Sequence, residues 1–162
     1  MDIRLLSESF SVRRLELTDI DIIYDMSSKN EIFYKYHPPF VTKQSIIEDM
    51  KALPPHKSYS DKYYIGFFEN NTLVALMDLI LDYPEEKIAF IGLLMVGVEY
   101  QNKGVGSKIV SDAADYLSEL GYKKIRVGVD KKNPQSNYFW SKNDFQIILE
   151  KEYNVMELNF IN

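Results

Sequence analysis

The chain has no cysteine and only two histidines among its 162 residues. Without thiols it cannot form disulfides, thiolate metal sites or a cysteine nucleophile, and this composition fits a reducing cytoplasm. Both histidines, His37 and His56, stand beside prolines. A histidine-rich metal centre therefore lacks ligands, and a Ser-His-Asp triad would have to use a loop histidine. We expect no metal.

Long apolar runs and basic clusters are also missing. No stretch is long enough to cross a bilayer, and residues 1–4 show no signal-peptide pattern, so we expect a cytoplasmic protein without a membrane partner. The formal net charge is -5. Nucleic-acid binding normally requires a positive face, which disfavours that partner. An acidic balance is compatible with cationic amine substrates, although it more often serves solubility.

The remaining composition, 46% hydrophobic and 27% charged, is that of a globular protein, and the length fits one domain over residues 1–162. Residues 10–17 alternate as a strand does, and Thr18-Asp19 is typical of a helix start. We expect a loop at 34–40, where Pro38 and Pro39 fix the backbone, and a helix capped by Thr42 that ends before Pro54.

The rest of the chain predicts a meander followed by alternating elements. Three strands, at 63–68, 73–81 and 87–98, are joined by turns at 69–71 and 83–86. A helix from Val105 to about Leu120 ends at Gly121. A strand (124–129), a helix (133–142) and two strands (145–153 and 155–160) follow. The order predicts an α/β (α+β) domain whose mixed central sheet contains an antiparallel meander and a parallel crossover.

The most informative segment is Gln101-Asn102-Lys103-Gly104-Val105-Gly106-Ser107, which lies between the buried strand run 91–98 and the long helix. A glycine-bearing turn at a helix N-terminus gathers unpaired N–H groups at the positive end of the helix dipole, so it binds phosphate or pyrophosphate. A Rossmann turn would need Gly-x-Gly-x-x-Gly after an early parallel strand, and a Walker loop would end in Gly-Lys-Ser/Thr. Neither spacing occurs here.

The order of elements and the Gln-x-x-Gly-x-Gly turn together resemble the GNAT acyltransferase superfamily, whose members transfer an acyl group from acyl-CoA to an amine. The family's signature matches at Gln101, Gly104 and Gly106. A second segment matches downstream, at Asn133, Ser136, Phe139, Lys142 and Phe145. The resemblance covers nearly the whole chain and implies the GNAT fold, with helices on both faces of the sheet.

The resemblance also implies an acetyl-CoA site. Backbone N–H groups of Gln101, Asn102, Lys103, Gly104, Val105, Gly106 and Ser107 would hold the pyrophosphate, and glycine permits its close approach. Leu94, Met95 and Val96 would offer strand backbone to the pantetheine arm, and the N–H near Val96 would hold the thioester carbonyl. Asn133 would bond the pantetheine, while Ser136 and Phe139 line its channel.

The proton donor departs from the family pattern. Many relatives place a tyrosine directly after the apolar residue at Phe139, but here that residue is Trp140, and indole is not a useful acid. Trp140 is interpreted as a wall of the acyl pocket or a packing residue. Tyr138 is the alternative acid, although half a helical turn predicts that it faces the other way. A thiolate also leaves well without an acid.

The general base is open as well, because no acidic residue interrupts 88–98. Asp78 lies inside an apolar run, where an unpaired carboxylate is costly, and we hypothesise that it acts as base through water or grips the substrate amine. Asp82 and Tyr83 are the other candidates. Around the paired prolines, Tyr34, Tyr36 and Phe40 are expected to line the acceptor site.

Two functions follow from these residues. The first is N-acetyl transfer from acetyl-CoA to a primary amine, on a small molecule or a protein, by direct transfer in a ternary complex. The alternative is a CoA-binding regulatory module with weak or no catalysis, which Trp140 and the missing strand carboxylate favour. A homodimer is left open.

Overall fold

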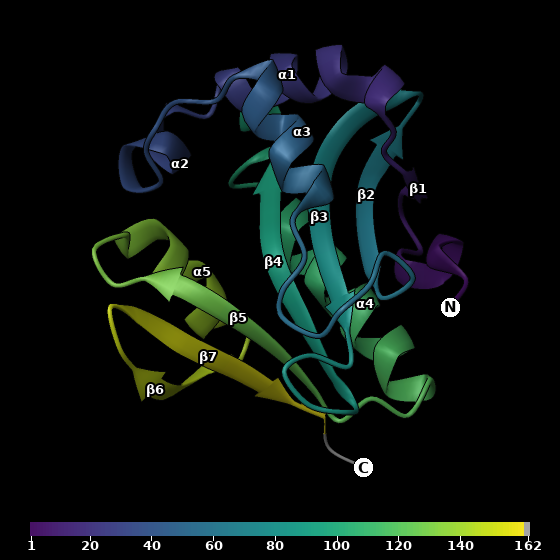
Figure 1. Ribbon diagram of the computed structural model, residues 1–162, viewed down its shortest axis with the longest axis vertical. Helices are drawn as coiled ribbons and strands as arrows, with labels where there is room; N and C mark the ends of the chain where they lie inside the picture. Colours follow the sequence, from purple (N-terminus) through teal and green to yellow (C-terminus); the bar gives the residue numbers. More distant parts are fainter. Residues whose placement is uncertain (161–162) are drawn as a thin grey trace.

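The computed structural model describes residues 1–160 and contains a seven-stranded sheet in the order β1-β2-β3-β4-β5-β7-β6 (Figure 1). Its strands are β1 (Ser11–Arg14), β2 (Lys62–Glu69), β3 (Thr72–Leu81), β4 (Ile88–Val96), β5 (Lys124–Asp130), β6 (Gln146–Glu150) and β7 (Tyr153–Asn159). Only the β4–β5 pair is parallel among the strands of residues 1–160. The predicted mixed sheet is confirmed. The domain predicted over 1–162 includes residues 161 and 162, which lie outside the described residues.

Helices cover both faces of this sheet, as expected (Figure 1). On one face, α4 (Val105–Glu119) and α5 (Pro134–Lys142) bury apolar side chains such as Ile109, Leu117 and Trp140. On the other face, α1 (Ile20–Ser28) and α3 (Lys43–Lys51) pack Ile23 and Ile46 against the strands β2 to β4. The remaining helices are α2 (Glu31–Tyr36), η1 (Ile3–Leu6), η2 (Leu17–Asp19) and η3 (Val98–Tyr100).

Local signals fixed several element boundaries. Asn70 and Asn71 both adopt positive φ in the β2–β3 hairpin, a conformation that asparagine tolerates better than most residues. The Thr42 side chain accepts a hydrogen bond from the Ser45 N–H and caps α3. Gly121, with φ +84, ends α4 as predicted.

The loop predicted over 34–40 is wrong in its first half, because α2 continues to Tyr36. Asn30 caps this helix by accepting a hydrogen bond from the Phe33 N–H, and Glu31 follows in its first turn. The two prolines therefore follow the helix, which ends at Tyr36 with His37 as its C-cap. The strand predicted over 87–98 is likewise too long, because Val98 begins η3.

The parallel pair β4–β5 stops halfway along β4. Its register runs from Ile88 opposite Lys124 to Ile91 opposite Val127, and no pairing follows among the described residues. At that point Gly92 is an extra residue, since Asp78 faces Leu93 while Leu79 faces Ile91. A bulge of this kind bends its strand. Beyond it β5 and β7 turn away from β4 (Figure 1).

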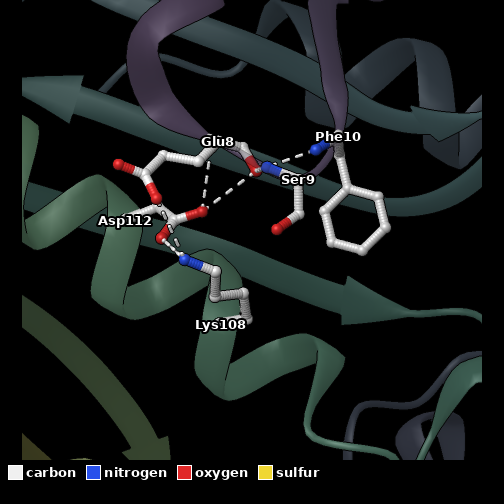
Figure 2. A network of polar contacts seen from close by, with 6 residues as sticks. Glu8, Ser9, Phe10, Lys108 and Asp112 are labelled. Atoms are coloured by element: carbon white, nitrogen blue, oxygen red, sulfur yellow. Dashed lines mark hydrogen bonds and ion pairs between the residues drawn. The ribbon is translucent and has the colours of Figure 1, made fainter.

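The amino-terminal segment is tied to α4 by a polar network around Asp112, whose residue is only 6% exposed (Figure 2). Its Oδ2 accepts hydrogen bonds from Ser7 Oγ at 3.2 Å and from the Glu8 N–H at 3.0 Å. Its Oδ1 accepts from Lys108 Nζ at 2.5 Å. The Ser7 Oγ in turn accepts from the Phe10 N–H just before β1. One carboxylate thus joins η1, the start of β1 and α4.

Replacing this carboxylate is expected to destabilise the fold. Asp112→Ala leaves the buried Ser7 hydroxyl and the Glu8 N–H without their acceptor, so the free energy of unfolding should fall by about 1–3 kcal/mol. Lys108→Ala is the control, because its side chain is 44% exposed and should contribute less than about 1 kcal/mol. Urea denaturation measures both variants. Equal losses would contradict a role that rests on the buried donors.

Candidate functional site

A cavity of about 210 Å³ opens where β4 has left β5. Its walls are the C-terminal part of β4, the turn before α4, the N-terminus of α4, one side of α5 and one side of α2. The site predicted from sequence therefore consists of segments that the fold brings together around one cavity.

The cavity gathers nearly all the residues predicted to bind the cofactor. Those that line it are Leu94, Met95, Val96, Gln101, Asn102, Gly104, Val105, Gly106, Ser107, Asn133, Ser136, Phe139 and Trp140. Lys103 does not line it, and its ammonium donates to the carbonyl oxygen of Glu99 at 2.7 Å instead. In this position Lys103 braces the turn rather than facing the cavity.

The turn leaves the first N–H groups of α4 available. Gly104 is the N-cap with φ +79, a left-handed conformation that glycine adopts without steric cost, and it has no side chain that could cap the helix. The first-turn N–H groups of Val105, Gly106 and Ser107 therefore lack a side-chain cap at the positive end of the helix dipole. Such a helix end favours an anion.

Gly106 is needed for close packing rather than for its backbone angle. A Cβ built at this position would stand 3.0 Å from Phe139 Cε2 and 3.4 Å from Val96 Cγ2. The absent side chain lets α4 approach both β4 and α5. It thereby brings the N-terminus of α4 close to the open edge of β4.

The free edge of β4 presents backbone groups to the cavity. The Gly97 N–H donates to the Val74 carbonyl oxygen at 2.8 Å. Since backbone groups of alternate residues in a strand point to the same side, the N–H and C=O groups of Met95 also point toward β3. The alternating positions, Leu94 and Val96, point their N–H and C=O groups the other way, where β5 no longer pairs. An extended ligand arm could pair with this edge as an added strand.

Gln101 has a role that sequence reasoning missed. Its side-chain amide donates to the Val96 carbonyl oxygen at 2.9 Å, so it ties the turn to the last residue of β4. The Val96 N–H stays directed at the cavity. The glutamine of the Gln-x-x-Gly-x-Gly turn could have indicated this bond, but the sequence analysis assigned a role only to its backbone N–H.

The helix α5 supplies the opposite wall. Asn133 caps it, since its Oδ1 accepts from the Ser136 N–H at 3.0 Å, and Pro134 occupies the first helical position. Trp140 is 7% exposed and packs edge-on against Phe139 and Phe145. It is thus both a core residue and a wall of the cavity.

Tyr138 was expected to face the other way from Trp140 on α5, and the burial of the two residues agrees, since Trp140 is buried and Tyr138 is exposed. Tyr138 nevertheless lines the cavity while remaining 70% exposed, which places it at the rim. The reason is that the cavity runs along α5 from Asn133 to Lys142 and is not confined to one stripe of the helix. The ammonium of Lys142 lies 5.8 Å from the centre of the Tyr138 ring.

One side of α2, with its two cap residues, lines the cavity with residues other than those predicted. Asn30, Phe33 and His37 contribute, whereas Tyr34, Tyr36 and Phe40 are not among the lining residues. Tyr34 packs instead against Phe33 and Phe40, with its ring edge-on to Phe33. Once the segment is helical, residues four apart share a face, so Phe33 and His37 stack at 4.5 Å and point together. Tyr100, Gln135 and Lys142 complete the set of unpredicted lining residues.

Asp78 lies outside this cavity, on the face of the sheet covered by α1 and α3. Its Oδ2 accepts from Lys62 Nζ at 2.6 Å, while its Oδ1 is buried without a hydrogen-bond partner among residues 1–160. Burial raises the pKa of this carboxyl, and the bonded Lys62 opposes that rise. Asp82, by contrast, accepts from the Lys87 N–H and the Tyr122 hydroxyl, which makes it part of the turn after β3.

Within residues 1–160 no group of three or more histidine or acidic side chains is arranged to hold a metal ion. Over the same residues, no helix combines the length and apolar character needed to span a membrane.

Known structures share this architecture. The PaiA N-acetyltransferase from Thermoplasma acidophilum, solved in complex with coenzyme A, matches with a TM-score of 0.71 and 20% identity over 94% of this chain and 99% of that one. An acetyltransferase from Thermus thermophilus gives 0.78 and 17% over 92% and 94%. A chimera of spermidine N-acetyltransferase SpeG from Vibrio cholerae and hSSAT gives 0.69 and 18% over 94% and 96%.

No curated protein sequence matches the chain significantly. The model of the acetyltransferase (GNAT) family, however, matches residues 24–145. That range includes the turn before α4, the free edge of β4 and the helix α5. The chain therefore belongs to the GNAT family of acetyltransferases.

Proposed function

We propose that this protein transfers an acetyl group from acetyl-CoA to a primary amine of a small molecule or a protein, directly and in a ternary complex. The observation that carries the proposal is the union of two features in one cavity, an uncapped N-terminus of α4 and an unpaired backbone edge on β4. The first suits a pyrophosphate and the second suits an extended arm. Coenzyme A has both parts.

The residues present fit that ligand. The N–H groups of Val105, Gly106 and Ser107 would hold the pyrophosphate, and the space left at Gly106 keeps β4 and α5 close to it. Leu94 and Val96 would bond the pantetheine arm through their backbone, and the Val96 N–H would polarise the carbonyl to be attacked. Asn133 would use its side-chain N–H groups, since its oxygen already caps α5.

When bound, acetyl-CoA supplies the acyl group on a good thiol leaving group. The protein's own contribution is to align the amine with that group, which by itself accelerates transfer by several powers of ten. At the cavity rim, the Tyr138 hydroxyl is our candidate donor of a proton to the departing sulfur. Asp78 is the candidate carboxylate on the acceptor side. Phe33 and His37 would line the part of the cavity that holds the acetyl group.

The proposal places the reaction in the cytoplasm, for which the absence of cysteine is the support. It includes no metal.

A second candidate function is a CoA-binding regulatory module with weak or no catalysis. Trp140 favours it, because this residue is buried and packed where many relatives carry a tyrosine acid. A thiol-release assay with a panel of amines and peptides separates the two functions, with thermal stabilisation by acetyl-CoA as the binding control. Stabilisation without thiol release favours the module, and the absence of stabilisation contradicts both.

Filling the space at Gly106 should weaken binding. In Gly106→Ala the new Cβ meets Phe139 Cε2 at 3.0 Å, so this ring in the cavity wall must shift, and overpacking of this kind costs about 1–3 kcal/mol. We expect the dissociation constant of acetyl-CoA to rise about ten-fold, measured by calorimetry. Ser111→Ala, on the exposed side of the same helix, is the matched control. Unchanged affinity in Gly106→Ala would place the ligand elsewhere.

Removing the hydroxyl at the rim tests the proton donor. Tyr138→Phe should lower kcat about ten-fold or more while the KM for acetyl-CoA stays constant, because general acids act on the chemical step. Tyr153→Phe is the control, since Tyr153 is also an exposed tyrosine but does not line the cavity. If kcat is the same in Tyr138→Phe and the parent protein, the thiolate leaves without this acid.

A further inference from the structure

A polar cluster lies on the sheet face covered by α1 and α3, beside the bulge that opens the cavity. It consists of Asp78 on β3, Lys62 on β2 and Asp49 on α3. The Lys62–Asp78 ion pair, at 2.6 Å, has side chains that are only 3% and 15% exposed. Ion pairs this deep cost desolvation free energy, so a stable fold alone is a poor reason for them.

The cluster carries one more negative than positive charge. Lys62 acts on both carboxylates, and Asp49 has no ion pair or side-chain hydrogen bond with another of residues 1–160. Glu48 of α3, Tyr64 of β2 and Tyr34 of α2 are further titratable groups nearby, and the charge of Glu48 adds to the rise in the pKa of Asp49 that burial causes. Burial raises the pKa of both phenols, and the charges of Asp49 and Asp78 raise that of Tyr64 further, so both are neutral. Two carboxylates therefore share one ammonium.

A gap in the strand beside Asp78 gives access to it. Gly92 is exposed although it lies in the central strand β4, and a Cβ built there would stand 3.3 Å from Asp78 Oδ2. The missing side chain therefore leaves a hollow directly beside the carboxylate oxygen that Lys62 bonds. Asp49 is exposed on α3 and lies near enough for its charge to act on Asp78, so a second carboxylate stands close to the first. Both features suit an approaching cation.

The hollow is too far from the Val96 N–H for Asp78 to contact the reacting amine directly. Asp78 pairs with Leu93, and Val96 lies three residues further along β4, which is about 10 Å at the usual rise of a strand. A carboxylate at this distance binds a different group of the acceptor, one that sits several bonds away from the amine to be acetylated.

We propose that Asp78 and Asp49, with Lys62 as the positioning residue, form a subsite for a second cationic group of the acceptor. The acceptor class is then an aliphatic molecule with two separated ammonium groups, one held at Gly92 and the other directed, as a free amine, toward Val96. This inference rests on the proposed function, because it assumes that the acyl group is delivered at β4. It makes the subsite a determinant of specificity and not of the chemical step.

The test compares two probes that differ by one charge. Calorimetry on the protein saturated with coenzyme A measures the binding of 1,5-diaminopentane and of pentylamine. We expect the diamine to bind about ten-fold or more tightly, since the loss of a charge partner at a largely buried site costs at least that factor. Equal affinity for the two probes, or no binding of either, would overturn the subsite.

Three variants locate the effect. Asp78→Asn and Asp49→Asn should each remove most of the preference for the diamine, and Gly92→Ala should reduce it by filling the hollow without changing any charge. Asp49→Asn and Gly92→Ala keep the test valid if Asp78→Asn fails to fold. Asp21→Asn is the matched control, because it removes the same charge from an 83% exposed carboxylate on α1. An equal loss of preference in that control would show that the preference for the diamine comes from the net charge of the protein, and it would contradict the subsite.

Thiol release from acetyl-CoA, measured in parallel, keeps the two proposals separate. If acetyl transfer to pentylamine and to the diamine has equal kcat/KM, the acetyltransferase function is supported and the subsite is contradicted. If the diamine binds tightly and in an Asp78-dependent way but no thiol is released, the subsite is supported and the acetyltransferase function is contradicted.

Discussion

The interruption of pairing between β4 and β5 is the constraint on which the rest of the site depends. The two strands are bonded only as far as Ile91 and Val127, and the extra residue Gly92 bends β4 at that point. From there on, the backbone of β4 has β3 on one side and, within residues 1–160, no strand on the other. Unpaired strand backbone is costly in a buried setting, so this edge is suited to a ligand that completes it.

The same interruption divides the site into two sides. Toward α4 and α5, the uncapped helix N-terminus and the free strand edge form a surface for a long anionic ligand. Toward α1 and α3, the buried Lys62–Asp78 pair and the exposed Asp49 make the surface beside Gly92 acidic. Donor and acceptor would thus approach β4 from opposite faces of the sheet and meet at its free edge.

Two neighbouring residues of α5 differ sharply in their surroundings. Trp140 stands where the resemblance to the family led us to expect a tyrosine, and its burial between Phe139 and Phe145 makes it a structural residue. Tyr138 is the hydroxyl that the fold places at the rim instead. In the proposed acceptor subsite, the carboxylate would come from Asp78 on β3, beside the space that Gly92 leaves.

Local rules in the sequence predicted the sheet class and the α4 turn, whereas the α5 wall was predicted from the resemblance to the GNAT family. Hydrophobic periodicity identifies strands and helices, and Gly104 and Gly106 mark the turn. The tertiary structure decided what depends on distant contacts. In the folded chain Tyr34 packs against Phe33, while Phe33 and His37 line the cavity. The Gln101 side chain donates a hydrogen bond to the Val96 carbonyl oxygen. Asp78 and Lys62 are sixteen residues apart in the chain, and they meet only because β2 and β3 pair in one particular register. No local sequence pattern predicts that register.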